Sequence, residues 1–112
     1  MAEPFFSQML KFIEGIEFPD VTLQCKHFFS GAALYANDKI MASFSPAGFA
    51  IKLPAVERKN LIQKGRGVEF RFFPDGPIKK EYVLLNESVI QDEESFQELF
   101  RESVGYVIEK AS

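Results

Sequence analysis

Two turn signals in the middle of the chain constrain the fold most. Asn37-Asp38 is a pair that tolerates the positive φ values of a two-residue hairpin turn. The segment Ser45–Gly48 reads Ser-Pro-Ala-Gly, with Pro and Gly where a type I turn prefers them. Two such turns so close together predict three short antiparallel strands, near residues 31–36, 39–44 and 49–53.

The turns also predict how these strands are paired. If Asn37-Asp38 is a two-residue turn, Tyr35 lies opposite Ile40 and Gly31 opposite Phe44. The second turn then places Phe44 opposite Phe49. This pairing places a set of apolar side chains together on one face of the sheet, which we predict to be the core face. Its small residues are Gly31 and Ala33, and its large residues are Tyr35, Ile40, Phe44, Phe49, Ile51 and Leu53.

Gly31 has a specific expected role on that face. We predict that it leaves room for the ring of Phe44 on the neighbouring strand, so Gly31→Val would destabilise the domain. The opposite face would hold Leu34, Met41, Ala50 and Lys52, which are too apolar together for full exposure. We expect a helix or a second subunit to cover that face.

The flanking segments predict helices and further strands. Apolar residues recur at helical spacing over 5–16 and again after Asp92, which is suited to cap the last helix. A shorter helix is expected over 54–64, ending near Gly65 or Gly67. Strands are expected over residues 20–28 and around Tyr82. The prediction is an α+β fold: an antiparallel β-meander sheet with N-terminal, middle and C-terminal helices, in a single domain over residues 1–112.

Length and composition narrow the class of protein. A chain of 112 residues is long enough for one core, and thirteen Phe with no Trp suggest that phenyl rings fill it. One Cys excludes an intrachain disulfide. The N-terminus has no basic region of a secretory signal, and the longest uncharged run, 40–51, is too short to span a bilayer. We therefore expect a cytoplasmic protein without membrane association.

Charge is distributed unevenly. The net charge is −3, but residues 52–80 hold eight cations against three acids, or +5. Residues 81–112 hold two cations against eight acids, or −6. We interpret most of these groups as solvated, with one modest basic surface. Direct binding of nucleic acid is not expected, because it needs several phosphate contacts.

Cys25 and His27 are the only residues that suggest covalent or metal chemistry. They lie two apart on a predicted strand, but a metal site needs three or four ligands and the chain has one Cys and one His. A Cys–His nucleophile would need an oxyanion hole and an orienting group. Ser43 and Ser45 lack a nucleophile elbow, and residues 64–67 lack a phosphate-loop motif. We expect no catalytic residue, no metal and no cofactor.

Consecutive Phe72 and Phe73 cannot both point inward from a regular strand. One of them would be exposed beside Arg71, and an exposed aromatic next to a cation is a common interface element. Two readings stay open, since the chain could also bend and bury both. The candidate interaction surface comprises Leu34, Met41, Lys52, Arg66, Arg71, Phe72 and Phe73.

The order of these segments resembles the TfoX N-terminal domain family. The runs that carry the resemblance are FFSGAALYANDKIMASF, GFAIKLPAVERKNL and VEFRFFPDGPIKKEYVLL, followed by an acidic helix. They cover about residues 10–110. The matching positions are Phe29, Gly31, Tyr35, Lys52-Leu53, Glu57-Arg58 and Tyr82, whereas Ser30 replaces the first Gly of the family's Phe-Gly-Gly step. We treat Phe29, Gly31, Tyr35 and Phe44 as a structural signature.

The resemblance implies an α+β fold and no established enzymatic activity. The best-known full-length members are regulators of bacterial natural competence with a second, C-terminal domain, for which 112 residues leave no room. We therefore expect a small regulatory domain that binds an unknown protein partner and that also self-associates as a homodimer. Two alternatives stay open: a regulator linked to nucleic acid, and a small-molecule sensor that uses the 52–80 cations with Tyr35 or Tyr82.

Overall fold

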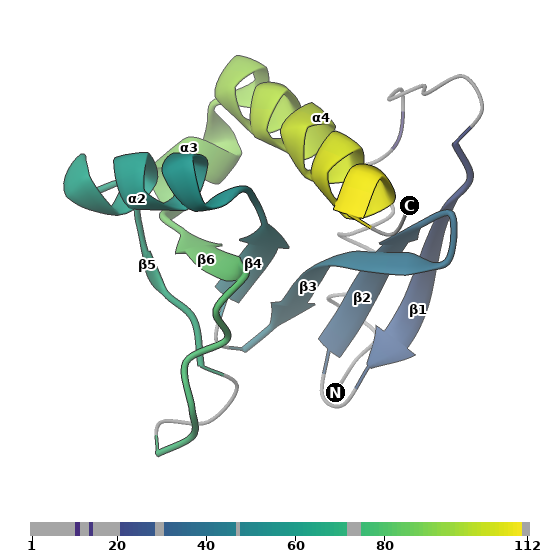
Figure 1. Cartoon of the computed structure of the whole chain (residues 1–112), viewed down its shortest axis with the longest axis horizontal. Coiled ribbons are helices and arrows are strands. Elements are labelled where there is room, and N and C mark those ends of the chain that lie inside the picture. Colours follow the sequence, from purple (N-terminus) through teal and green to yellow (C-terminus); the bar gives the residue numbers. More distant parts are fainter. Residues whose placement is uncertain are drawn as a thin grey trace.

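The structure, a computed structural model, describes residues 11, 14, 21–28, 31–46, 48–71 and 75–110 (Figure 1). These residues form one antiparallel sheet in the order β1-β2-β3-β4-β6-β5. The strands are β1 (Leu23–Phe28), β2 (Gly31–Ala36), β3 (Lys39–Ser45), β4 (Gly48–Lys52), β5 (Gly67–Glu69) and β6 (Tyr82–Leu85). The helices are α2 (Ala55–Gln63), α3 (Glu87–Gln91) and α4 (Glu93–Lys110).

The predicted α+β class and the three central strands are confirmed. Asn37 and Asp38 have φ values of 49° and 68°, as a two-residue hairpin turn requires. The Asn37 side chain also accepts a hydrogen bond from the Thr22 backbone N–H at 2.8 Å, which ties this turn to the start of β1. Helix α2 ends at Gln63 with Lys64 as its C-cap, and Gly65 follows with a φ of 71°, so the predicted glycine stop is confirmed.

The strand order departs from a simple meander at the end. Strands β1 to β4 follow one another, but β6 lies between β4 and β5, so β5 forms an edge of the sheet. The short helix α3 was not predicted, because its five residues give too little apolar periodicity to detect. The N-terminal helix predicted over 5–16 lies almost entirely outside the described residues.

A bulge between β2 and β3 overturns half of the predicted pairing. Tyr35 lies opposite Ile40 as expected, but the register then shifts and Phe44 lies opposite Ala32 rather than Gly31. The cause is one extra residue on β3, between Ile40 and Ala42. From Leu34 back toward Gly31, each residue of β2 therefore lies opposite a β3 residue one position later than predicted. Because side chains alternate along a strand, those β2 side chains lie on the face opposite to the predicted one. The pairing of Phe44 with Phe49 across β3 and β4 is as predicted.

The bulge changes which side chains form the core. Leu34 and Met41 are fully buried in the main cluster together with Phe49 and Ile51. Tyr35 and Ile40 lie instead on the opposite face, where they are half-buried. The predicted core face was therefore right for β3 and β4 beyond the bulge and wrong for β2 and the start of β3.

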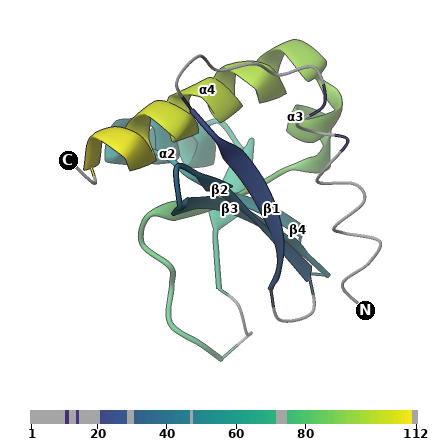
Figure 2. The same ribbon diagram turned by 90° about the vertical axis from the view of Figure 1, so that its right-hand side faces the viewer.

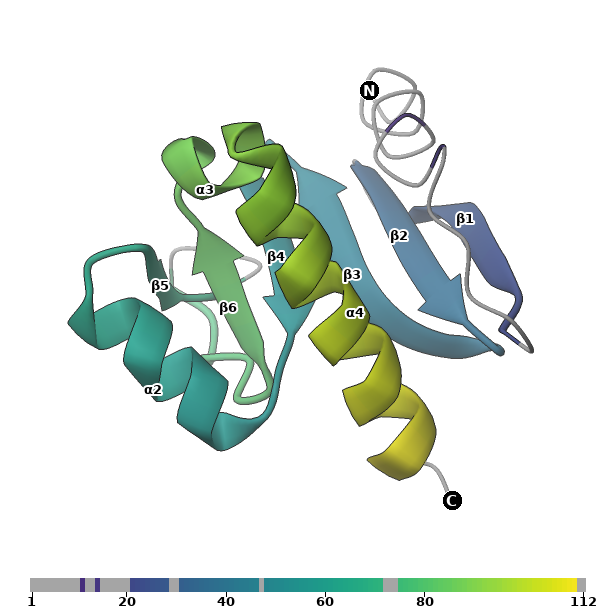
Figure 3. The same cartoon turned by 90° about the horizontal axis from the view of Figure 1, so that it is seen from above.

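Helix α4 covers this core, as its apolar stripe predicted. Phe96, Phe100 and Val104 are buried against the sheet. The rings of Phe96 and Phe49 meet edge to face, with centroids 5.2 Å apart. Figure 3 shows α4 crossing over β3 and β4. A phenyl-rich contact thus joins the last helix to the middle of the sheet.

Helices lie on one side of the sheet only, among the described residues. Figure 2 shows α2, α3 and α4 on that side, with a long extended segment descending on the other. We call this segment the arm; its described residues are 70–71 and 75–81. The Lys79 N–H donates to the Phe70 carbonyl at 2.8 Å, which holds the two sides of the arm together. A second small apolar cluster of Ala50, Phe70 and Tyr82 lies at its base.

Candidate interaction surface

Two residues of the predicted interaction surface lie in the core. Leu34 and Met41 are both fully buried, and the hydroxyl of Ser103 on α4 donates to the Met41 carbonyl at 3.4 Å. Helix α4 covers the face that they share. A helix and a second subunit were the two alternatives expected for this face. Neither side chain is available to a partner in this structure, so the structure corrects their place on that surface.

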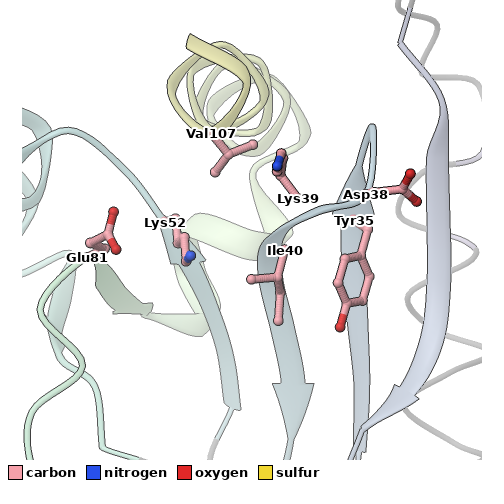
Figure 4. A pocket seen from close by; sticks show the side chains of 7 residues that line it. All are labelled: Tyr35, Asp38, Lys39, Ile40, Lys52, Glu81 and Val107. Atoms are coloured by element: carbon pink, nitrogen blue, oxygen red, sulfur yellow. The ribbon is translucent and has the colours of Figure 1, made fainter. Parts of the chain in front are cut away.

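Lys52 and Tyr35 lie next to an open depression of about 400 Å³. Figure 4 shows its lining residues: Tyr35, Asp38, Lys39, Ile40, Lys52, Glu81 and Val107. Tyr35 and Ile40 point away from α4, whereas Val107 extends from α4 itself (Figure 4). Small-molecule sites have polar groups that converge on the ligand. Because these side chains lie on both sides of the sheet, the depression fits that description poorly.

Two lysines stack on tyrosine rings near this depression. Lys26 Nζ lies 4.6 Å from the ring centroid of Tyr35, and Lys52 Nζ lies 5.5 Å from that of Tyr82. Burial, with smaller contributions from Tyr35 and Glu81, raises the pKa of Tyr82 to about 12. Tyr82 is therefore a neutral phenol at physiological pH.

A larger groove of about 600 Å³ lies between α2 and the arm. Its lining residues define what we call the basic groove: Ala55, Arg58, Lys59, Ile62, Gln63, Glu69, Ile78, Lys79, Lys80 and Tyr82. Four of them are cations and one is a carboxylate, a balance of +3 in a chain whose net charge is −3. The cations come from two separate stretches of the chain, Arg58-Lys59 on α2 and Lys79-Lys80 on the arm.

Exposed aliphatic side chains gather around the same groove. Among the described residues, the large hydrophobic side chains with high exposure are Val56, Ile62, Val68 and Ile78, at 77%, 39%, 52% and 39%. Ile62 and Ile78 line the groove, whereas Val56 on α2 and Val68 on β5 lie outside its lining. The groove thus combines exposed aliphatic side chains with cations.

Arg58 has a structural role at the floor of this region. Its Nη1 donates to the carbonyl of Leu53 and, at 3.5 Å, to that of Glu81. It thereby joins α2 to the end of β4 and to the residue before β6. The cations at the open part of the groove are accordingly lysines.

The other predicted surface cations lie outside the basic groove. Arg66 donates to the Ser95 hydroxyl at 3.3 Å, linking the end of α2 to α4. Arg71 donates to the Gly76 carbonyl at 2.8 Å, within the arm. Phe72 and Phe73 lie outside the described residues. The structure therefore brings together Lys59, Lys79 and Lys80, which the sequence placed only within a basic stretch.

Gly31 is required by the backbone of the next strand rather than by a ring. A Cβ at Gly31 would lie 2.0 Å from the Phe44 carbonyl oxygen and 2.9 Å from the Ser45 Cα. Backbone atoms cannot move aside as a flexible side chain can. The expectation that Gly31 makes room for the Phe44 ring is corrected, because that ring packs toward Phe49 and the main core. Phe29 lies outside the described residues.

Two of the residues considered for chemistry, Cys25 and Ser43, have described surroundings that do not activate them. Burial raises the pKa of the Cys25 thiol, which disfavours the nucleophilic thiolate. The Ser43 hydroxyl is buried without a hydrogen-bond partner among the described residues, so nothing there would activate it. Within the same part of the chain, no group of three His, Cys, Asp or Glu side chains could hold a metal ion.

The sequence match to a known family covers the whole sheet. The profile of the TfoX N-terminal domain matches residues 20–106, from before β1 to near the end of α4. The chain belongs to the TfoX N-terminal domain family. In this TfoX N-terminal domain, the family's glycine at Gly31 lies where β2 and β3 come into close backbone contact. Searches of curated proteins and of solved structures found no match.

None of the helices that the structure describes in this TfoX N-terminal domain is long and apolar enough to cross a membrane. Its basic groove was missed by sequence reasoning. The excess of cations over residues 52–80 was the available signal, but only the fold shows which of them lie together. Val56 and Ile62 offered a second signal, since α2 buries only Leu61 and leaves its other aliphatic side chains outside.

Proposed function

We propose that this TfoX N-terminal domain is a small, non-enzymatic regulatory domain of the cytoplasm that acts by binding a partner protein at the basic groove. One observation carries the proposal: the exposed aliphatic side chains of Ile62 and Ile78 line the same groove as the cations of α2 and the arm. Protein interfaces combine an apolar centre with a polar rim in this way.

The proposal that the domain is not an enzyme has separate support. Cys25 has a raised pKa, and Ser43 has no neighbouring base among its described surroundings. A nucleophilic enzyme needs its nucleophile activated by a base or by a lowered pKa. These two side chains meet neither condition.

Self-association is the second candidate, because a dimer could use the same exposed aliphatic side chains. Ile62 and Val68 belong to two different elements, and a second copy could cover both. Light scattering at micromolar concentration separates the two candidates. A dimeric mass that returns to a monomer in Ile62→Ser would favour self-association over a foreign partner.

Site-specific photo-crosslinking tests the proposal. A photoreactive phenylalanine analogue at Ile62 or Ile78 should form an adduct with a defined partner protein in the native host. The same analogue at Arg101, on the exposed side of α4, is the matched control and should form none. Adducts of equal yield at all three positions, or none at Ile62 and Ile78, would refute binding at the groove.

A further inference from the structure

We infer that the basic groove recognises an acidic peptide segment of its partner, one that carries carboxylates together with aliphatic side chains. This inference rests on the proposed function and adds the chemistry of the occupant. Charge complementarity between the groove and the segment is the main argument for it.

The positive charge of the groove comes from opposite walls. Lys59 lies on α2, whereas Lys79 and Lys80 lie on the arm. A segment lying between the walls would meet ammonium groups on both sides. Glu69 is the single acid in the lining, so the net attraction is for anions. Lysines act as point charges, which suits single carboxylates.

The aliphatic side chains specify the rest of the occupant. Ile62 on α2 and Ile78 on the arm line the groove, and each is 39% exposed. These two side chains face the groove from α2 and from the arm, so an occupant that lies between the walls can cover both. A peptide with Leu- or Ile-like side chains between its acids fits this pattern.

Nucleic acid fits the same surface less well. Single-stranded nucleic acid binds where aromatic rings offer stacking platforms beside cations. The aromatic side chain in the lining is Tyr82, which is 9% exposed. Arg58, the side chain best shaped for a phosphate, already donates to two backbone carbonyls. The exposed apolar contacts are aliphatic, and these do not stack on bases.

Fluorescence anisotropy with a synthetic probe tests the inference. The probe is a short fluorescein-labelled peptide that repeats Glu-Leu-Glu-Glu-Leu, and the comparison peptides replace either every Glu with Lys or every Leu with Ser. The wild-type chain should bind the probe and neither comparison peptide. Lys59→Glu/Lys80→Glu should weaken binding by about tenfold or more, because it reverses charge on both walls.

The matched control is Lys39→Glu/Arg101→Glu, which makes the same change of net charge at exposed positions outside the groove. It should leave probe binding unchanged. Ile78→Ser, with circular dichroism to confirm the fold, should weaken binding without any change of charge. Equal loss in both double variants, or no binding of the probe by the wild-type chain, would overturn the inference.

Two further probes define the competing occupants. Oligo-dT or anionic phospholipid vesicles that bind more tightly than the peptide, and lose binding in Lys59→Glu/Lys80→Glu, would overturn the assignment to a peptide. Failure of the inference remains distinct from failure of the proposed function. If the crosslinked adduct at Ile62 still forms in Lys59→Glu/Lys80→Glu, a partner binds at the groove but its charge does not matter.

Discussion

At the scale of single residues, Gly31 shows how closely two backbones can determine one side chain. The position is the second glycine of the family's Phe-Gly-Gly step, and the nearest atoms to a Cβ there are the carbonyl group of Phe44 and the Cα of Ser45. Any side chain must push β2 and β3 apart. A backbone contact restricts position 31 more strictly than a contact with a phenyl ring would. A ring can rotate away, whereas these backbone atoms are held in place by the hydrogen bonds between the strands.

We expect Gly31→Val to lower the free energy of unfolding by about 2–4 kcal/mol, with Gly31→Ala already destabilising, because overpacking a strand pair forces its backbone to move. Chemical denaturation followed by circular dichroism measures this. Gly105→Ala is the matched control: it lies in the interior of α4 with open space around a Cβ, and should stabilise by about 0.5–1 kcal/mol. Unchanged stability in both Gly31 variants would contradict the steric reading.

At the scale of elements, α4 begins with a local cap. The Ser95 hydroxyl donates to one carboxylate oxygen of Asp92 at 3.0 Å, and the Ser95 N–H donates to the other at 3.4 Å. These two hydrogen bonds hold the pKa of Asp92 below its ordinary value, and the bond from the Ser95 hydroxyl makes the larger contribution. Sequence reasoning identified this cap, since an acid before a helical stripe is a local signal.

Asp92→Ala should lower the melting temperature at neutral pH, because it removes an acceptor for the first turn of α4. Since the folded pKa is lowered, the ionised carboxylate stabilises the fold above its ordinary pKa, and this contribution is lost as the pH falls through the folded value. The gap between wild type and Asp92→Ala should therefore narrow in acid. Asp92→Asn retains a capping oxygen, so its melting temperature should fall less than that of Asp92→Ala. A difference in melting temperature between wild type and Asp92→Ala that does not change with pH would argue against a charged cap.

The bulge in β3 explains why the elements were easier to predict than their faces. Turn residues specify the pairs next to them, and Tyr35 opposite Ile40 was predicted correctly from Asn37-Asp38 alone. One extra residue then places Met41 and Ala42 both toward the core, which no turn signal encodes. Leu34 is buried in a cluster that includes α4, more than fifty positions away in the chain, whereas Tyr35 lies on the other face and is half-buried.

At the scale of the whole molecule, acidic side chains of two helices approach one another. Glu102 on α4 has a raised pKa, first because of its partial burial and then because Glu57 on α2 and Glu98 on α4 lie nearby. These charges repel across the helical side of the sheet. The basic groove also depends on the fold, since Lys59 on α2 and Lys80 on the arm line one groove although they are distant in the sequence. The excess of cations over residues 52–80 predicts a positive surface, but only the topology shows where on the molecule it lies.

Glu102→Gln should raise the melting temperature at neutral pH, since it removes the charge that burial and the two neighbouring acids disfavour. The raised folded pKa means that the penalty is absent below the ordinary pKa, where Glu102 is protonated in both states, and grows as the pH rises through the folded value. Thermal unfolding across this range checks the sign. A stabilisation that persists in acid would point to packing rather than charge.

The bulge in β3 also bears on the order in which the domain can fold. In an excised β2–β3 hairpin, the turn at Asn37-Asp38 would be the main determinant of the register. No other element would be present to favour the shifted pairing over the regular one. In the folded domain, Leu34 and Met41 share one cluster with α4, which favours the shifted register. We therefore expect selection of the hairpin register and docking of the last helix to be one cooperative event, and a slow one because it closes a long loop.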